Sequence, residues 1–300
     1  MNTSSIAATA VVVGVDGSAD SLRAVRWAAG DAARRHRPLH LLHAHNWPEF
    51  AYPPAGLALP VAYESDAQET VTRMLTDAAA QARDVSEDLQ ISTESTTRLC
   101  VPALLAASRR AALVVVGSRG LGGFTALLVG STGAELAAHA ACPVVIVRDV
   151  DRTDGPNIGR VVVGVDESHD ADLALAVAFE QAAFRSTGLT AVNACQWQVA
   201  GQRDGVASPI YGEQDALAGA QRALAESLAG WQEKYPQVDV RLDVVPGRAS
   251  SVLVDASAGA ELLVVGARGH GGFAGLLLGS VSQAALHHAH CPVVIARRPS

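Results

Sequence analysis

Glycines and a serine recur at fixed spacing in two places along the chain. The segment VVVGSRGLGGFTALLVGS covers residues 114–131 and LVVGARGHGGFAGLLLGS covers residues 263–280. Each copy follows an apolar run and reads Gly-x-x-Gly, nine residues, then Gly-Ser. Glycine lets the backbone approach a ligand closely. A helix that begins at Ser131 or Ser280 would offer free N–H groups and a positive dipole end to a phosphate. The pattern therefore predicts two phosphate cradles.

Two other interpretations of these glycines are less well supported by the sequence than a phosphate-binding loop. A flexible connection would explain one copy, but fixed spacing in two copies favours a binding loop. A dinucleotide fingerprint needs Gly-x-Gly-x-x-Gly after the first strand, where the chain has Val15 and Asp16. The P-loop sequence GxxxxGK[ST] is absent, and the only lysine is Lys234. We therefore expect any cationic phosphate contact to come from arginine, which offers forked donors.

The repeat extends over the whole chain. VVVGVDGS at 11–18 returns as VVVGVDES at 161–168, and ACPVVIVR at 141–148 returns as HCPVVIAR at 290–297. In the first copy we expect strands at 11–15, 39–44, 91–99, 113–116 and 143–147, and helices at 20–35, 64–89, 102–109 and 131–140. A Pro- and Gly-rich loop is expected at 47–60. Alternating strands and helices predict an α/β fold with a parallel sheet between helices.

Length and composition fit two globular domains. The chain has 300 residues, of which 49% are hydrophobic and only 4% aromatic. We place the domains at 1–150 and 158–300, with a linker at 148–159. The formal net charge of −7 argues against unspecific binding to nucleic acid or to an anionic membrane. No apolar run reaches the length of a membrane span, and no signal peptide or CxxC pair is recognised, so we expect a cytoplasmic protein.

The Gly-x-x-Gly-x9-Gly-Ser pattern, with Val-Gly-Val-Asp at the end of the first strand, resembles the universal stress protein family in its ATP-binding branch. The resemblance covers essentially the whole chain as a tandem form. It implies two copies of a five-stranded parallel-sheet, Rossmann-like domain. It also implies ATP, optionally with Mg²⁺, at the strand ends of each copy.

The resemblance assigns roles to individual residues. The nucleoside would lie at the ends of the first two strands, at Gly14, Val15, Asp16 and Ala44 in the first copy and Gly164, Val165, Asp166 and Ala194 in the second. Phosphates and ribose would lie at Gly117, Arg119, Gly120, Gly122, Gly123, Gly130, Ser131 and Thr132, and at Gly266, Arg268, Gly269, Gly271, Gly272, Gly279, Ser280 and Val281. One departure concerns the third strand, which ends at Gly247 in the second copy where the first has Arg98. We expect a different loop shape there.

Other side chains could indicate catalysis or metal binding, and simpler explanations are preferred. Asp16 and Asp166 could act as bases, but a carboxylate at a strand end more often holds a ribose hydroxyl. His43 is matched by Asn193, which favours polar packing over a shared metal site. Near the end of the second copy, His287, His288, His290 and Cys291 resemble zinc ligands, but the first copy offers only His139 and Cys142. We predict no catalytic residue and no metal site.

The leading functional hypothesis is a non-enzymatic, ATP-binding regulator of a stress response. Two alternatives stay open: a slow ATPase or nucleotidyl-transfer enzyme on the same scaffold, and a structural interaction module with empty sites. CPVVIV and its copy CPVVIA are expected to be edge strands, which associate readily. The resemblance implies that they pair within one chain as a pseudo-two-fold unit, and a homodimer is also expected. We expect no nucleic-acid or membrane partner, and the protein partner is unknown.

Overall fold

The computed structural model describes residues 6–7, 9–44, 61–120, 130–149, 154–166, 168–195, 213–269 and 277–297. The chain divides into two compact units, with the boundary between Asp149 and Val150. We call them unit 1 and unit 2 and describe each by itself. No helix among these residues is long and apolar enough to cross a membrane.

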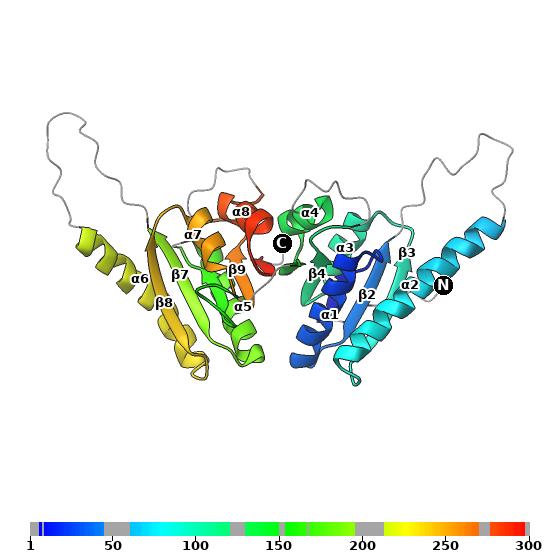
Figure 1. Cartoon of the computed structure of the whole chain (residues 1–300), viewed down its shortest axis with the longest axis horizontal. Helices are drawn as coiled ribbons and strands as arrows, with labels where there is room; N and C mark the ends of the chain where they lie inside the picture. Colours follow the sequence, from blue (N-terminus) through cyan, green and yellow to red (C-terminus); the bar gives the residue numbers. More distant parts are fainter. Residues whose placement is uncertain are drawn as a thin grey trace, which may run out of the picture. The chain divides into compact units, whose positions relative to one another are not determined.

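Unit 1 alternates strands with helices throughout its described part (Figure 1). The elements are β1 (Val11–Gly14), α1 (Ala19–Arg34), β2 (Leu39–Ala44), α2 (Val61–Val85), β3 (Ile91–Thr96), α3 (Cys100–Ser108), β4 (Leu113–Gly117), α4 (Ser131–His139) and β5 (Val144–Val147). The strands pair in parallel in the order β3-β2-β1-β4-β5. Helices α1 and α2 pack on one face of this sheet, and α3 and α4 pack on the other.

Unit 2 repeats this arrangement. Its elements are β6 (Val161–Gly164), α5 (His169–Arg185), β7 (Leu189–Cys195), α6 (Glu213–Lys234), β8 (Val240–Pro246), α7 (Ala249–Ala256), β9 (Leu262–Gly266), α8 (Ser280–His288) and β10 (Val293–Ala296). The strands again pair in parallel, in the order β8-β7-β6-β9-β10. The predicted fold class, two tandem copies of a five-stranded parallel α/β domain, is confirmed.

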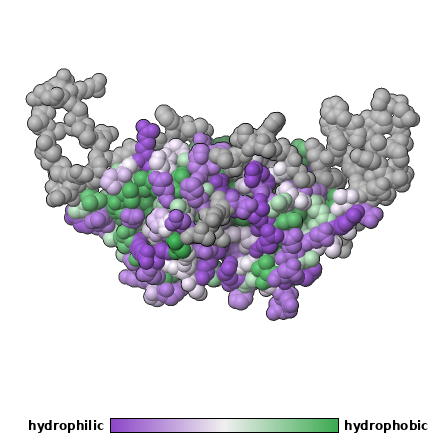
Figure 2. Space-filling view, viewed as in Figure 1, coloured by the Kyte–Doolittle hydropathy of each residue, from purple (hydrophilic) through white to green (hydrophobic). Residues whose placement is uncertain are grey.

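Apolar patterning explains why these segments form these elements. The central strands are continuous Val and Leu runs, as expected where both faces are covered, and β1, β4 and β5 are buried almost throughout. The helices bury one stripe, and in Figure 2 most of the outward face of α2 is hydrophilic. Ser18 caps α1 by accepting a hydrogen bond from the Ser21 N–H at 3.1 Å.

Several predicted boundaries in unit 1 were wrong by a few residues, among them the start of α2, which lies at Val61 and not at residue 64. Helix α3 begins at Cys100 and contains Pro102 in its first turn, where the missing N–H would have had no helical partner anyway. Helix α2 ends at Val85, because a turn closed by Leu89 N–H to Ser86 O leads into β3. Strand β3 ends at Thr96, whereas β8 runs on to Pro246 and is followed by the Gly247 N–H bond to Cys195 O at 3.0 Å.

Candidate functional site

A cavity of about 500 Å³ opens at the carboxyl ends of the strands of unit 1. Its lining comes from the ends of β1, β2 and β4 and from the first turns of α3 and α4. Small-molecule pockets occupy about 300–1,000 Å³. Open parallel sheets bind ligands at this end of their strands. The cavity thus has the place and the size of a ligand site.

The predicted site residues of unit 1 come together in this cavity. The residues that line it include Gly14, Val15, Asp16, Ala44, Gly117, Arg119, Gly120, Gly130, Ser131 and Thr132. The predicted residues Gly122, Gly123, Gly271 and Gly272 lie outside the described residues. The ends of β1, β2 and β4 and the start of α4 are far apart in the sequence. In the structure they line the same cavity.

The turn into α1 fixes the carboxylate of Asp16. Its Oδ1 accepts hydrogen bonds from the N–H of Ser18 at 2.9 Å and from the Ser18 hydroxyl at 2.6 Å. Its Oδ2 lies so close to Gly120 that a Cβ at that position would overlap it. Glycine at 120 thus lets the carboxylate lie against the glycine segment.

Two glycines of the segment have opposite steric settings. A Cβ at Gly117 would come within 2.7 Å of the Asp20 backbone, so α1 approaches β4 closely only because glycine is there. Gly130 has an ordinary φ of −70°, and a Cβ there would meet no described atom nearer than Ser118 O at 3.6 Å. Packing explains glycine at 117, whereas the described surroundings of Gly130 leave room for a side chain.

Helix α4 begins beside the cavity, and among the described residues no side chain caps it. Gly130 is the N-cap residue, and its carbonyl accepts the N–H of Ala134 at 3.3 Å. N–H groups in the first turn of a helix lack a helical partner and form the positive end of its dipole. Ser131, Thr132 and Gly133 bring this turn to the cavity lining. The arrangement can bind an anion.

A buried carboxylate that the sequence analysis did not single out, Asp20, holds the start of the glycine segment. Its Oδ2 accepts hydrogen bonds from the Ser118 hydroxyl at 2.8 Å and the Arg119 N–H at 3.1 Å, and the Arg23 guanidinium contacts Oδ1. Burial alone would raise the pKa of Asp20, but the Ser118 bond and the two arginine charges outweigh it and lower the pKa. The only sequence signal for Asp20 is its recurrence as Asp170.

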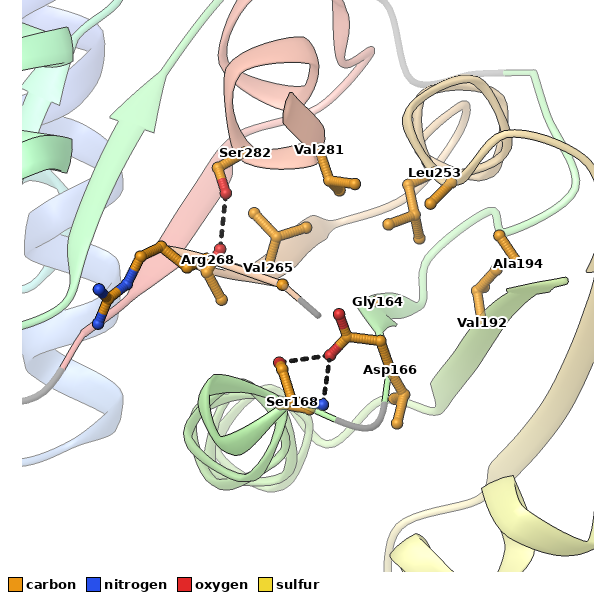
Figure 3. A pocket seen from close by; sticks show the side chains of 15 residues that line it. Gly164, Asp166, Ser168, Val192, Ala194, Leu253, Val265, Arg268, Val281 and Ser282 are labelled. Atoms are coloured by element: carbon orange, nitrogen blue, oxygen red, sulfur yellow. Dashed lines mark hydrogen bonds between the residues drawn. The ribbon is translucent and has the colours of Figure 1, made fainter. Parts of the chain in front are cut away.

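The same end of unit 2 has a smaller hollow, of about 70 Å³ (Figure 3). Predicted residues in its lining are Gly164, Val165, Asp166, Ala194, Gly266, Arg268, Gly269 and Val281. Gly279 and Ser280 are at the start of α8 and do not line this hollow. A second hollow, of about 320 Å³, adjoins the first and shares Val165, Asp166, Ser168 and Ala171 with it.

The backbone frame of the two sites is the same. Gly130 N–H donates to Ser118 O at 2.8 Å, and Gly279 N–H donates to Ala267 O at 2.9 Å. Asp166 accepts the N–H of Ser168 at 3.0 Å, as Asp16 does from Ser18. Both glycine segments therefore close in the same way, next to a carboxylate held in the same turn.

Comparison with known proteins identifies the family to which both units belong. The Universal stress protein family matches residues 8–148 and again residues 157–297. The chain belongs to the universal stress protein family. A universal stress protein of Mycobacterium tuberculosis is 38% identical over 294 residues, covering 96% of this chain and 97% of that one. A relative from Mycolicibacterium smegmatis is 35% identical over 292 residues, covering 96% of each chain.

A solved structure shows the same fold over the full length. The crystal structure of a universal stress protein from Archaeoglobus fulgidus has a TM-score of 0.68 to this chain. It is 19% identical in sequence and covers 98% of each chain. The fold of this universal stress protein is therefore also found in a protein that is distant in sequence.

Several cavity residues of this universal stress protein were not anticipated. They are Ser21, Leu42, Cys100, Leu104, Val116, Ser118 and Gly133. Val116, Ser118 and Gly133 adjoin predicted residues, and Leu42 lies two residues before Ala44 on the same strand, so the predicted pattern could have indicated them. Nothing in the sequence indicated Cys100, because only the packing of α3 brings it to the cavity. Burial raises the pKa of the Cys100 thiol. A hydrogen bond with Thr132 lowers this pKa in part, and the negative charge of the nearby Asp16 raises it further.

His43 in unit 1 and Asn193 in unit 2 occupy matching positions and make the same kind of hydrogen bond. A hydrogen bond of 2.7 Å joins His43 Nδ1 to Val15 O, and Asn193 Nδ2 donates to Val165 O at 2.9 Å. Each ties the second strand of its unit to the residue before the site aspartate. Among the described residues, no group of three or more His, Cys, Asp or Glu side chains is placed to hold a metal ion.

Proposed function

We propose that this universal stress protein is an ATP-binding regulator of a stress response, with one adenine-nucleotide site in each unit. The observation that carries the proposal is the glycine before each site helix. Gly130 and Gly279 have ordinary φ values of −70° and −75°, and a Cβ at either would meet no described atom within 3.4 Å. Both nevertheless stand before a serine and an uncapped helix. A bound phosphate would use that space and the free N–H groups.

The rest of the unit 1 cavity supports a nucleoside beside the phosphates. Leu42, Leu104 and Val116 give it an apolar side on which a base can lie. Asp16 offers carboxylate oxygens of the kind that accept ribose hydroxyls, and Ala44 brings the end of β2 to the cavity. Mg²⁺, where present, would enter with the phosphates of ATP.

In this proposal the nucleotide is a ligand more than a substrate. The single lysine, Lys234, lies on α6 over the rings of Trp231 and Tyr235, 5.2 Å from each ring centroid, and not in the site. Asp16 is engaged by Ser18. We expect hydrolysis well below a typical turnover of about 10 s⁻¹. Faster phosphate release that Asp16→Ala abolishes would favour the enzyme alternative.

Nucleotide content and titration test the proposal most directly. The protein is denatured after purification and the released nucleotide is identified and counted, and nucleotide-free protein is titrated with ATP by calorimetry. We expect up to two adenine nucleotides per chain. Protein that is purified empty and gives no heat with ATP would favour the interaction-module alternative.

Glutamate substitutions locate the sites. Gly130→Glu places a negative charge beside the free N–H groups, and we expect it to weaken binding in unit 1 about a hundredfold, which corresponds to about 2.7 kcal/mol. Gly279→Glu should do the same in unit 2. His139→Glu and His288→Glu add the same charge at the far ends of the two helices and serve as controls. If both glycine variants stay folded and bind two nucleotides with unchanged affinity, the glycine segments are connectors.

The proposal also includes the predicted domain limits, 1–150 and 158–300, and a cytoplasmic location. The four free cysteines, two of them buried, suit a reducing compartment. Pairing of the copies through β5 and β10, and a homodimer, stay predictions. Val145→Pro combined with Val294→Pro would remove strand donors and should lower compactness and stability. Wild-type unfolding and scattering of that double variant would exclude the pairing.

A further inference from the structure

Strand β8 forms the outer edge of the unit 2 sheet (Figure 1). Among the described residues it pairs only with β7. Its side chains are exposed from Arg241 through Asp243, and Leu242 is 43% exposed. An edge strand presents a row of backbone N–H and C=O groups that can pair with another chain. What fits this edge depends on which of its groups point outward.

The hydrogen bonds to β7 fix the direction of the β8 backbone. The Leu189 N–H donates to Asp239 O at 2.9 Å, and the Gly247 N–H donates to Cys195 O at 3.0 Å. Along a strand in a parallel pair, the backbone groups of successive residues point alternately toward one neighbour and away from it. The odd-numbered residues of β8 therefore face β7, and the even-numbered residues face outward. The outward residues are Val240, Leu242, Val244 and Pro246.

The side chains of β8 form a charged face and an apolar face. By the register of β6, β7 and β8, Asp243 lies on the same face of the sheet as Gly164, where a Cβ would meet Leu253 of α7. Arg241 shares this face, because it lies two residues from Asp243. Helix α7 packs on β7, and both charged side chains are exposed beside it. Leu242 lies on the opposite face, where α6 packs on β8.

The two charges of this face are available to another molecule. No hydrogen bond or ion pair joins Arg241 or Asp243 to another described side chain. The charge of Arg241 acts on Asp239, two residues earlier, but that carboxylate already accepts a hydrogen bond from Arg160 at 2.7 Å. A strand that matches this edge therefore needs a carboxylate opposite Arg241 and a cation opposite Asp243.

A second copy of β8 meets both needs. When two copies lie antiparallel about a two-fold axis at Leu242, Arg241 of each faces Asp243 of the other. Leu242 faces its own copy, and Val240 faces Val244. The outward residues then form the hydrogen-bonded pairs, and the charged residues form the closer pairs between them. Opposite charges directly across an antiparallel pair stabilise it.

Other alignments of the two copies fit less well. A two-fold axis at Arg241 or Asp243 would place that residue opposite its own copy, where like charges repel. An axis at Val244 would leave both charges without an opposite charge across the pair. Pro246 has no N–H to donate, so the ladder ends after Val244. The charges and the proline thus favour one alignment.

Strand β3, the outer strand of unit 1, is a weaker match for β8. Its sequence ISTEST has one charged residue, Glu94, which lies 3.2 Å from His40 Nε2. An antiparallel pair of β3 with β8 of another chain would have one ion pair, between Glu94 and Arg241, whereas β8 with β8 has two. Pairing of β3 with β8 would also continue from chain to chain, whereas the two-fold pair is closed.

We infer that the outer edge of β8 is an interface for a second copy of this chain. Residues 240–244 of the two copies pair antiparallel about Leu242, with two Arg241–Asp243 ion pairs on one face and the apolar side chains on the other. This surface is distinct from β5 and β10. The inference does not depend on nucleotide binding.

Charge exchange in the full-length chain tests the alignment. Arg241→Asp places two carboxylates opposite each other, and Asp243→Arg does the same with two cations. We expect each variant alone to dimerise at least tenfold more weakly than the wild type in analytical ultracentrifugation. An equimolar mixture of the two variants restores both ion pairs and should dimerise within about threefold of the wild-type affinity. Arg109→Asp, at the end of α3, is the control for net charge.

Three outcomes of this experiment overturn the inference. They are a wild-type chain that stays monomeric at its highest soluble concentration, single variants that dimerise as the wild type does, and a mixture that associates no more than its separate components. Far-UV circular dichroism confirms that each variant is folded. The combined variant Arg241→Asp, Asp243→Arg should dimerise on its own, because each charge again faces its opposite.

A disulfide trap gives a second measurement that retains both charges. Leu242→Cys places two thiols across the two-fold axis, with Cα atoms about 5.5 Å apart, which is within the range of a disulfide. Thr93→Cys on β3 is the matched control, and the wild type with its four free cysteines sets the background. We expect mild oxidation to link Leu242→Cys chains at least tenfold faster than Thr93→Cys chains. Equal rates, or disulfides that form between the two variants when they are mixed, would overturn the inference.

Discussion

Unit 1 and unit 2 use different polar residues at the same place in the same fold. Position 40 in β2 is a buried histidine, within hydrogen-bond distance of Ser92 at 2.8 Å and Glu94 at 3.2 Å on β3. The matching residue of β7 is Thr190, which accepts a bond from Arg160 Nε at 3.0 Å. The polar chemistry that joins the second and third strands is thus free to change, provided that each buried group finds a partner.

The glycine segments differ in a similar way. Asp20 is held by the Ser118 hydroxyl, the Arg119 N–H and Arg23. Asp170 accepts the Arg268 N–H at 3.2 Å, but Ala267 and Leu173 stand where unit 1 has Ser118 and Arg23. The backbone that closes the loop is shared, whereas the side chains that secure it are fewer in the described part of unit 2.

Among the substitutions that compare the two units, Arg160→Ala in unit 2 is expected to cause the largest loss of stability. This buried arginine also bonds to Asp239 Oδ2 at 2.7 Å and to the carbonyls of Leu189 and Asp239, and its removal takes one hydrogen bond from each of these groups and from Thr190. The loss of four hydrogen bonds, at about 1 kcal/mol each, should destabilise unit 2 by about 3 kcal/mol, with faster hydrogen exchange in β7 and β8. The exposed Arg109→Ala in unit 1 is the control. Unchanged exchange in β7 and β8 would show that the cluster does not stabilise unit 2.

The glycines at the ends of β4 and β9 offer a second comparison. A Cβ at Gly117 would lie 2.7 Å from backbone carbon of Asp20, whereas at Gly266 the nearest atom would be the Asp170 Cβ at 3.0 Å. We expect Gly117→Ala to destabilise unit 1 by about 2–3 kcal/mol and Gly266→Ala to destabilise unit 2 by about 1 kcal/mol. Chemical denaturation with unit-resolved hydrogen exchange measures both. Equal losses of stability in the two variants would mean that α1 and α5 move aside equally easily to make room for the added methyl group.

Asp20 and Asp170 each hold the start of a glycine segment. Replacing them with asparagine should produce a smaller difference in stability between the two units. Asp20→Asn removes the charge that faces Arg23 and Arg119, and we expect a loss of about 1–2 kcal/mol at neutral pH. Asp170→Asn should lose less. The pKa of Asp20 is lowered in the folded chain, so its contribution is complete above the unfolded-state pKa of about 4 and disappears as pH falls through the folded pKa. The wild-type and Asp20→Asn stabilities should therefore converge in acid. A gap that stays constant with pH would exclude this account.

The smallest expected difference is a pH response at position 40. Burial lowers the pKa of His40, and the attraction of Glu94 opposes this only in part. The unfolded chain then binds the proton more readily, so unit 1 loses stability as pH falls below the ordinary histidine pKa of about 6.5. Exchange in β2 and β3 should quicken between about pH 6.5 and 5 relative to β7 and β8. His40→Thr, which copies unit 2, should remove this response, and a response that persists would point to another group.

The sequence alone determined the architecture and the outline of both sites. Apolar runs such as VVVG in β1 and VVIV in β5, repeated after a fixed interval, are local patterns that predict buried parallel strands. The glycine spacing and the Val-Gly-Val-Asp strand end carried enough information to predict residues that meet in the unit 1 cavity. The position of these residues at one end of the sheet can be predicted because strand ends and helix starts are set by neighbours in the sequence.

Only the tertiary structure decided what surrounds those residues. Asp20 reaches Ser118 and Arg119 across about a hundred residues, and Cys100 meets Thr132 because α3 packs against α4. A Cβ on Gly164 would lie 2.6 Å from Leu253, whereas a Cβ on Gly14 would lie 3.3 Å from Leu104. Such contacts depend on how helices pack on a sheet, and side-chain packing between distant segments leaves no periodic signal in a single sequence.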